Sequence, residues 1–326
     1  MRITGEIRVP GDKSISHRAF MLGALAQGAT VVRGALESLD VRSTRRALET
    51  LGARIEKAGD AWRVIGGGLC EPAAVIDAGN SGTTARLLSG ICAGIEGVTV
   101  MTGDHSLVMR PMARVIQPLQ KMGASFLARR DRFLPMAIRG GGLSGITWDI
   151  DVSSAQVKSA LLLAGLKAQG VTTVSEPSLS RDHTERMLPY FGAQIERDGT
   201  TVRVRGPQSL SAREVQVPGD PSSAAFPAVW AAASKGSQIL LRDICLNPTR
   251  TGYIAVLRRM GARISIENIR EFSGEPVGDI FVAGGELEAA TIEGGEIPTL
   301  IDEIPVLAVA ACFAQGTTVI RDAGEL

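Results

Sequence analysis

Apolar and polar residues alternate in two different ways along the helices that this sequence predicts. Segments such as SALLLAGLKAQ and AAFPAVWAAAS are apolar nearly all round, and this pattern predicts helices buried in the centre of a domain. Segments such as VRSTRRALETLG are charged on one side and apolar on the other, as expected of a helix that covers a sheet. Short Thr- and Val-rich segments, typical of strands, lie between them.

Two glycine markers recur in phase along the chain. The first is a Gly that ends a helix and precedes a Thr/Val strand, with intervals of 69, 73, 66 and 80 residues, at Gly28, Gly97, Gly170, Gly236 and Gly316. The second is a Gly-Ala before a strand, which follows 24, 26, 22 and 25 residues later, at Gly52, Gly123, Gly192 and Gly261. We interpret each marker as a helix C-cap in the left-handed conformation. Each unit therefore reads β-α-β-α-β-β.

The first unit illustrates the predicted elements. We expect its strands near residues 7–9, 30–33, 54–57 and 62–65, and its helices near residues 16–26 and 40–51.

A longer period lies above this repeat. The motif VPGD occurs at 9–12 and again at 217–220, an offset of 208 residues or three units. This predicts an α/β protein of two similar domains: a complete one over 12–217, and a second formed by 1–11 plus 218–326. Six complete units would need roughly 420 residues, and the repeat places the next Gly-Ala marker at about residue 340. We therefore expect a C-terminally incomplete molecule with an incomplete second domain.

Composition narrows the class of protein. The 326 residues suffice for two ordinary domains, and 35 basic against 34 acidic residues give a net charge of +1, which argues against a general nucleic-acid binder. Aromatic residues are only 4%, which leaves few platforms for stacking bases. The N-terminus lacks a signal peptide, the apolar run 304–314 is too short to span a bilayer, and the four cysteines show no C-x-x-C spacing. We expect a cytoplasmic protein without membrane partners or bound metal.

Polar residues gather where the first strand of each unit enters its first helix. At the first such junction, PGDKSISHR, the residues Lys13, Ser14, Ser16 and Arg18 lie at a helix N-terminus. Unpaired N–H groups, the positive end of the helix dipole, two cations and two hydroxyls together suit a phosphate or carboxylate. The other junctions are DAGNSGTTARL, DVSSAQVKS, PGDPSSAAF and IPTLIDEIP. Ordinary N-capping is the alternative, and we favour it for PGDPSS.

Three further residues are candidates for chemistry. Arg110 and Arg181 each precede the second helix of a unit, where the dipole disfavours a cation, which suggests an anion shared between them; a solvated loop is the alternative. Asp302 lies beside Glu303 in an apolar run and is a candidate general base, with helix N-capping as the alternative reading. GGGLSG at 140–145 precedes a strand and not a helix, so we expect no dinucleotide site there.

Taken together, these junctions resemble the EPSP synthase (3-phosphoshikimate 1-carboxyvinyltransferase) family, and in particular its class II bacterial branch. The resemblance runs from Gly5 to Leu326 and rests on PGDKSISHR, GNSGTT, RPM, SSAQVKSALLLAGL, RDHTERML, VPGDPSSAAF, NPTRTGYI and IDEIPVLAVAACFAQGTTVI. It implies paired domains, each of three βαβαββ units around buried parallel helices. It also implies transfer of the enolpyruvyl group of phosphoenolpyruvate to the 5-hydroxyl of shikimate 3-phosphate in aromatic amino-acid biosynthesis, without a cofactor or metal.

The resemblance assigns roles to individual residues. The contacts that it implies for shikimate 3-phosphate are Lys13, Ser14, Arg18, Ser154, Ala155, Gln156, Arg181 and Asp302. Those for phosphoenolpyruvate are Lys13, Gly82, Arg110 and Gln156. Asp302 and Lys13 match the catalytic residues, with Asp302 as the base that takes the hydroxyl proton.

Two departures from the family pattern matter. The family continues after Glu-Leu with R-V-K-E-S-D-R and further basic residues that this chain does not contain. We therefore expect weak binding of shikimate 3-phosphate and little or no turnover, with a C-terminal segment of its own chain as the missing partner. Leu87 stands where some members carry Pro, near the site of the inhibitor glyphosate, whereas Gly82 leaves room for the inhibitor and points towards sensitivity.

Two alternatives stay open on the sequence. UDP-N-acetylglucosamine enolpyruvyl transferase would show a Lys-Asn pair and a reactive loop Cys, whereas this chain has Lys13-Ser14 and no Cys at 104–114. The other alternative is a truncated, non-catalytic phosphate-sugar binding fragment.

Overall fold

The computed structural model describes residues 2–324. The chain divides into two compact units: unit 1 joins the N-terminal residues up to Asp12 to those from Pro218 onward, and unit 2 comprises Lys13–Val217. None of the helices in the described range is both long enough and apolar enough to cross a bilayer.

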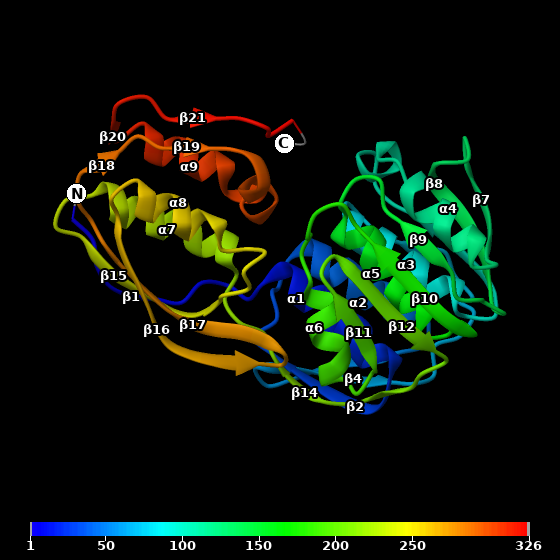
Figure 1. Ribbon diagram of the computed structural model, residues 1–326. Coiled ribbons are helices and arrows are strands. Elements are labelled where there is room, and N and C mark those ends of the chain that lie inside the picture. Colours follow the sequence, from blue (N-terminus) through cyan, green and yellow to red (C-terminus); the bar gives the residue numbers. More distant parts are fainter. Residues whose placement is uncertain (1, 325–326) are drawn as a thin grey trace. The chain divides into compact units, whose positions relative to one another are not determined.

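Unit 2 contains three similar repeats, each with its own sheet (Figure 1). The first repeat consists of α1 (Lys13–Leu25), β2 (Ala26–Arg33), α2 (Leu39–Thr50), β3 (Arg54–Ala58) and β4 (Ala61–Gly66). The second consists of β5 (Ile76–Asp77), α3 (Gly82–Ala93), β6 (Gly97–Thr102), the 3-10 turn η1 (Leu107–Met109), α4 (Ala113–Lys121), β7 (Ser125–Arg129) and β8 (Phe133–Gly140). The third consists of β9 (Thr147–Asp149), α5 (Ala155–Gly165), β10 (Gly170–Ser175), α6 (His183–Tyr190), β11 (Ile195–Asp198) and β12 (Thr201–Gly206).

The first repeat differs from the other two in the strand that lies beside its second strand. In the second and third repeats, the first strand pairs in parallel with the strand after the central helix, β5 with β6 and β9 with β10. In the first repeat this place beside β2 is taken by β13 (Leu210–Ser211) and β14 (Glu214–Gln216). The strand predicted near 7–9 is instead β1 (Thr4–Ile7), which pairs in parallel with β15 (Gln238–Cys245) of unit 1.

Unit 1 is built on the sheet β1-β15-β17-β16. Its elements after β1 are α7 (Pro221–Ala233), β15, α8 (Gly252–Arg259), β16 (Arg263–Phe272) and β17 (Glu275–Ala283). They continue with β18 (Leu287–Glu288), β19 (Thr291–Ile292), the 3-10 turns η2 (Gly294–Thr299) and η3 (Ile301–Glu303), α9 (Ile304–Ala311), β20 (Ala314–Gln315) and β21 (Val319–Ile320). Figure 1 shows α7 and α8 on one face of this sheet, and their apolar sides form the core of the unit with α9.

The glycine markers take two different structural roles. The second marker is as predicted: Gly52, for example, follows the last helical residues of α2 and has φ +102°. The first marker is not a helix cap, because Gly28 (φ +102°) lies inside β2 and Gly97 (φ +117°) begins β6. The first-marker glycine lies where the chain passes from the central helix into the following strand. That position needs a positive φ, which glycine adopts readily.

Each repeat of unit 2 contains a third structurally important glycine that the sequence analysis did not identify. Gly66, Gly140 and Gly206 pair across the sheet with the first-marker glycines. A Cβ on any of them would lie 2.2–2.3 Å from a carbonyl oxygen near the end of the preceding central helix. Only a residue without a side chain lets the sheet approach that helix end so closely.

The central helices of unit 2 are buried as predicted, and those of unit 1 only in part. α1, α3 and α5 bury nearly all of their side chains. In α7, however, Phe226 is 63% and Trp230 48% exposed, and the neighbouring Val309 and Phe313 are 51% and 63% exposed. These residues line an apolar hollow of about 580 Å³, which we call the α7–α9 groove. In unit 2 three central helices share the core, whereas the described part of unit 1 has α7 and α9 in that role.

Gly90 tests how tightly the central helices of unit 2 pack. A Cβ at this position of α3 would lie 2.0 Å from the carbonyl oxygen of Ala160 in α5. We expect Gly90→Ala to lower the free energy of unfolding by about 1–3 kcal/mol despite the better helix propensity of Ala, measured by urea denaturation followed by circular dichroism. Gly68→Ala, with no atom within 4 Å of the added Cβ, is the control, and equal stabilities of the two variants would contradict this packing.

Candidate anion-binding site

The first turns of the three central helices of unit 2 carry most of the predicted site residues. α1 begins at Lys13, so the helix starts three residues earlier than predicted. Ser81 caps α3 by accepting a hydrogen bond from the N–H of Thr84 (3.1 Å), and Ser154 caps α5 by accepting one from Val157 (3.4 Å). Each cap satisfies one N–H and leaves others at the helix end for a ligand.

Lys13 and Ser14 lie at the start of α1. The side chain of Lys13 is half exposed, and its Nζ lies 3.8 Å from Oδ2 of Asp40. An exposed pair at this separation contributes at most about 1 kcal/mol. The ion pair with Asp40 is therefore weak.

Arg18 lies deeper than a surface ligand contact would. It is only 4% exposed. Its guanidinium donates to Oγ1 of Thr184 (2.7 Å) and Oγ of Ser159 (2.7 Å), and to the carbonyl oxygen of Ser14 (3.0 Å). The contacts tie the start of α1 to α5 and α6, and place a fixed positive charge beneath Ser14.

Arg86 is a candidate site residue that the sequence analysis did not assign. Its Nη1 donates to Oε1 of Gln156 (2.9 Å), and Nε2 of Gln156 donates to Oγ1 of Thr83 (3.1 Å), so the first turns of α3 and α5 are joined. A Cβ on Gly82 would lie 2.9 Å from Nη1 of Arg86. The sequence does contain a signal for this contact, because Arg86 lies four residues after Gly82 and a helical side chain leans back towards the residue four positions earlier.

Arg110 also lies beside Gly82, with its Nη1 3.7 Å from where a Cβ would be. It donates to Oδ1 of Asn80 (2.7 Å) and Oγ of Ser106 (3.3 Å), and both of these partners are neutral. Burial lowers the pKa of Arg86, and the nearby charges of Arg110 and Arg114 lower it further. Mutually repelling cations around a residue without a side chain are suited to bind an anion.

Asp104 orients Arg110 indirectly. Its carboxylate accepts hydrogen bonds from the N–H groups of Leu107 (2.8 Å) and Ser106 (3.0 Å) and from Nδ2 of Asn80 (2.7 Å). The amide of Asn80 thereby turns its oxygen towards Arg110. The Leu107 N–H, with lesser help from Asn80 and Ser106, lowers the pKa of Asp104.

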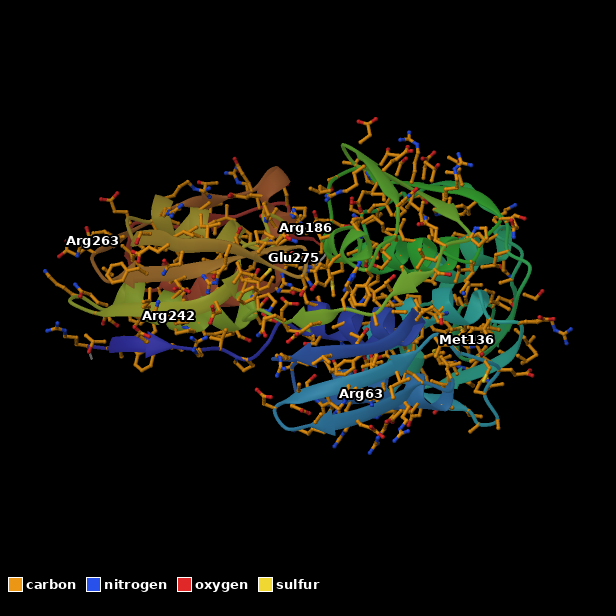
Figure 2. All side chains as sticks on the ribbon, turned by 90° about the horizontal axis from the view of Figure 1, so that it is seen from below. Arg63, Met136, Arg186, Arg242, Arg263 and Glu275 are labelled. Carbon is orange, nitrogen blue, oxygen red and sulfur yellow. The ribbon has the colours of Figure 1, made fainter. Side chains whose placement is uncertain are left out.

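Arg181 lies near the end of the short loop between β10 and α6 and is half buried. The next residue, Asp182, is buried and accepts hydrogen bonds from Nε of Arg186 (2.9 Å; Arg186 is labelled in Figure 2) and from Arg197 (2.7 Å). These contacts hold the start of α6, directly after Arg181. The anion that we predicted to be shared between Arg110 and Arg181 stays a prediction.

Asp302 belongs to unit 1, where it lies exposed in η3. The residue at the N-cap position of α9 is Glu303, which makes no capping hydrogen bond. Glu303 is buried and accepts a hydrogen bond from Ser222, which in turn accepts one from Arg250 (2.8 Å).

Arg250 is the centre of this buried network. Its Nη1 lies 3.1 Å from Asp12, and its Nη2 lies 3.6 Å from Asp220. Burial alone would lower the pKa of Arg250, but the carboxylates of Asp12, Asp220 and Glu303 raise it above its ordinary value. Asp220 also caps α7 by accepting from the N–H groups of Ser222 and Ser223, which is the capping role expected for PGDPSS.

The architecture is similar to that of solved enolpyruvyl transferases. It resembles that of the enolpyruvyl transferase NikO from Streptomyces tendae, with a TM-score of 0.76 over 98% of this chain and 75% of that one, at 18% identity. Within this fold the chain belongs to the EPSP synthase (3-phosphoshikimate 1-carboxyvinyltransferase) family, whose family model matches residues 1–326.

Relatives at higher identity agree with this family. The chain is 53% identical over 330 residues to 3-phosphoshikimate 1-carboxyvinyltransferase from Desulforamulus reducens, covering 100% of this chain and 77% of the relative. It is 55% identical over 332 residues to the enzyme of that name from Synechococcus sp. (strain JA-3-3Ab), covering 99% and 75%. An EPSP synthase structure from Acinetobacter baumannii superposes with a TM-score of 0.92 at 44% identity, covering 98% and 73%. The predicted family and fold are therefore confirmed, and neither alternative function is favoured.

Asp104 gives the site a pH-dependent component of stability. Because folding lowers its pKa below the ordinary value of 3.8, its stabilisation is complete at neutral pH and is lost as the pH falls through the folded-state pKa. We expect Asp104→Asn to lower the urea midpoint at pH 7, and the difference from the unchanged chain to shrink as the pH falls below 3.8. Asp131→Asn, at an exposed turn, is the control. A difference that is independent of pH would contradict this role of the carboxylate.

Proposed function

We propose that this chain catalyses transfer of the enolpyruvyl group of phosphoenolpyruvate to the 5-hydroxyl of shikimate 3-phosphate, with release of inorganic phosphate. This is the reaction of the EPSP synthase family. The observation that carries the proposal is that the guanidinium groups of Arg86 and Arg110 both lie beside Gly82, 2.9 and 3.7 Å from where a Cβ would be. Both substrates are polyanions, which suits such a site.

We assign shikimate 3-phosphate to the starts of α1 and α5 and to the loop before α6. The proposed contacts are Lys13, Ser14, Arg18, Ser154, Ala155, Gln156, Arg181 and, from unit 1, Asp302. Hydroxyls and free N–H groups at two helix starts would receive the sugar hydroxyls and the phosphate. Arg18 would act as a buried charge beneath Ser14, because its own hydrogen bonds run to protein groups.

We assign phosphoenolpyruvate to the neighbouring cations. The proposed contacts are Lys13, Gly82, Arg110 and Gln156. We add Arg86, because it hydrogen-bonds Gln156. Glyphosate, itself an anion, would compete for the same space beside Gly82.

The chemistry then follows from charge. Asp302 takes the proton of the 5-hydroxyl as the hydroxyl oxygen attacks C2 of phosphoenolpyruvate. C3 gains a proton in the same step, and the product is a tetrahedral intermediate. Loss of a proton from C3 re-forms the double bond as the C2–O bond to phosphate breaks. Lys13 and the two arginines stabilise the phosphate and carboxylate charge through both steps.

We further propose that units 1 and 2 are the two domains of the family, and that a C-terminal segment is the partner that covers the α7–α9 groove. Unit 2 supports this, because its core has three central helices where the described part of unit 1 has two. Exposed aromatic rings at Phe226, Trp230 and Phe313 would be buried by a third helix. The occupant that we propose is therefore an apolar helix of such a segment.

A cytoplasmic location is also proposed. All four cysteines are free thiols, as is usual in a reducing compartment. Burial raises the pKa of the Cys92 thiol to about 12, so this thiol is unreactive.

The proposed reaction is tested by phosphate release from phosphoenolpyruvate, with the chain alone and with a C-terminal segment of the Desulforamulus reducens relative added. We expect release only when shikimate 3-phosphate is present, little by the chain alone, and a rise on addition. Binding of the segment should shift the tryptophan emission to shorter wavelength, and this shift should be lost in Trp230→Phe. Lys13→Met should lower kcat/KM at least about 100-fold, whereas Lys121→Met, an exposed lysine of the same unit, should not.

Two outcomes would contradict the proposal. No release by folded protein with the segment present would refute the enzymatic activity of this chain. An emission shift that persists in Trp230→Phe would refute the α7–α9 groove as the place where the segment binds.

Gly82 distinguishes the two substrates. In Gly82→Ala the added Cβ would displace the end of the flexible Arg86 side chain, which changes the anion site but leaves the fold intact. We expect KM for phosphoenolpyruvate to rise about tenfold, a loss of about 1.4 kcal/mol of binding, with KM for shikimate 3-phosphate within about twofold. Steady-state kinetics with each substrate varied in turn, with Gly68→Ala as control, measure this. An equal rise of both KM values would contradict the assignment.

A further inference from the structure

Unit 2 contains a buried ion cluster that the proposed reaction does not use. Nζ of Lys158, on α5, lies 2.5 Å from Oε1 of Glu176 and 2.7 Å from Oε1 of Glu185. The three side chains are at most 1% exposed. Glu176 directly follows β10 and Glu185 lies in the first turn of α6, so the cluster joins three elements of the third repeat.

A buried cluster of this kind fixes geometry more than it adds stability. The gain from pairing charges in the interior is largely offset by the cost of removing them from water, but a displaced partner would leave a buried charge uncompensated. Two carboxylates share one ammonium here, so each needs further donors. Glu176 finds them in Ser180, whose N–H (2.9 Å) and Oγ (2.6 Å) both donate to its carboxylate.

These hydrogen bonds close the loop that leads to Arg181. Ser180 is the residue immediately before Arg181, so the Glu176 carboxylate determines where the Arg181 backbone lies. A second tether holds the same loop: Oγ of Ser153 donates to the carbonyl oxygen of Ser178 (2.6 Å) and accepts from its N–H (3.0 Å). Ser153 directly precedes Ser154, the cap of α5.

The cluster also sets the spacing of α5 and α6. Lys158 lies one turn inside α5 from Ser154, and Glu185 lies next to Thr184. The hydroxyls of Ser159 and Thr184 are 2.7 Å apart, and both accept from Arg18. The elements that carry the proposed phosphate contacts are thus held by one buried charge cluster.

We propose that Lys158, Glu176 and Ser180 are positioning residues that hold Arg181 in register with the phosphate of shikimate 3-phosphate. They thereby determine the preference for the phosphorylated substrate over shikimate. The inference rests on the proposed function, because it takes Arg181 as a ligand of that phosphate. An arginine binds phosphate through paired, directional hydrogen bonds, so a loosened backbone loses affinity even when the charge is retained.

The test measures equilibrium binding of shikimate 3-phosphate and of shikimate to this chain by titration calorimetry. Ser180→Ala removes one hydrogen bond to Glu176 and leaves the buried charges in place, and Glu176→Gln removes the charge with little change in shape. We expect each to weaken binding of shikimate 3-phosphate about fivefold to tenfold, and binding of shikimate by less than about twofold. Ser180→Thr, which keeps the hydroxyl, should restore binding.

Ser175→Ala is the matched control. Ser175 lies at the end of β10 and is half buried like Ser180, and its Oγ lies 3.0 Å from Oγ1 of Thr201. Its substitution should leave both affinities unchanged. Urea denaturation of every variant shows whether it is folded, and Lys158→Met is avoided because it would leave two buried carboxylates without their cation.

Arg181→Ala separates failure of the inference from failure of the proposed function. If Arg181→Ala does not weaken binding of shikimate 3-phosphate, or if the unchanged chain does not bind it, the proposed assignment of the site fails. If Arg181→Ala weakens binding but Ser180→Ala and Glu176→Gln do not, the positioning role alone is refuted. In a chain that already carries Arg181→Ala, Ser180→Ala should weaken binding of shikimate 3-phosphate by less than a further factor of about two. If the two substitutions weaken binding independently, so that their effects multiply, the positioning role is also refuted.

Discussion

The structure of unit 2 depends on the close approach of its central helices at their first turns. Gly90 lets α3 lie against the backbone of α5, and Gln156 and Arg86 join the beginnings of the same two helices. Arg18 joins the beginning of α1 to α5 and α6. Helix starts brought together in this way concentrate unpaired N–H groups and the positive ends of helix dipoles. The chain adds lysine and arginine to that place, and the resulting concentration of positive charge favours a polyanion.

Unit 1 contributes the carboxylate of the proposed base. Asp302 is exposed, but its neighbour Glu303 is held through Ser222 by Arg250, whose charge is in turn paired with Asp12. Asp12 directly precedes Lys13 in the chain. The network that supports the proposed base therefore ends at the residue next to the proposed catalytic lysine. The same pattern occurs in unit 2, where Lys158 lies beneath the loop of Arg181. In both units a proposed site residue is adjacent in the chain to a buried carboxylate: Asp302 to Glu303, and Arg181 to Asp182.

Periodicity predicted much of this fold, because its markers are local. Gly52 and its equivalents terminate helices through their own φ angles, and this requires no knowledge of the rest of the chain. The strand near residues 7–9 was counted in the first repeat, although the predicted domain boundary placed it with residues 218–326, where β1 pairs with β15. A strand's partner depends on topology, and β13 and β14 take its place beside β2. Trp230 was expected inside a buried helix, since helix polarity alone does not show what packs against each face. Arg86 and Lys158 were visible within quoted motifs, but their roles come from partners 70 and 18 residues away.

The central claim is that the first turns of α1, α3 and α5 and the loop before α6 form the polyanion site. Hydrogen-exchange mass spectrometry of this chain, with and without shikimate 3-phosphate, tests it most directly. The account predicts that the ligand slows exchange in the first turns of α1 and α5 and in the loop around Arg181, with phosphoenolpyruvate extending protection to the start of α3. Protection confined to other elements, or none at a ligand concentration that saturates binding in calorimetry, would contradict it.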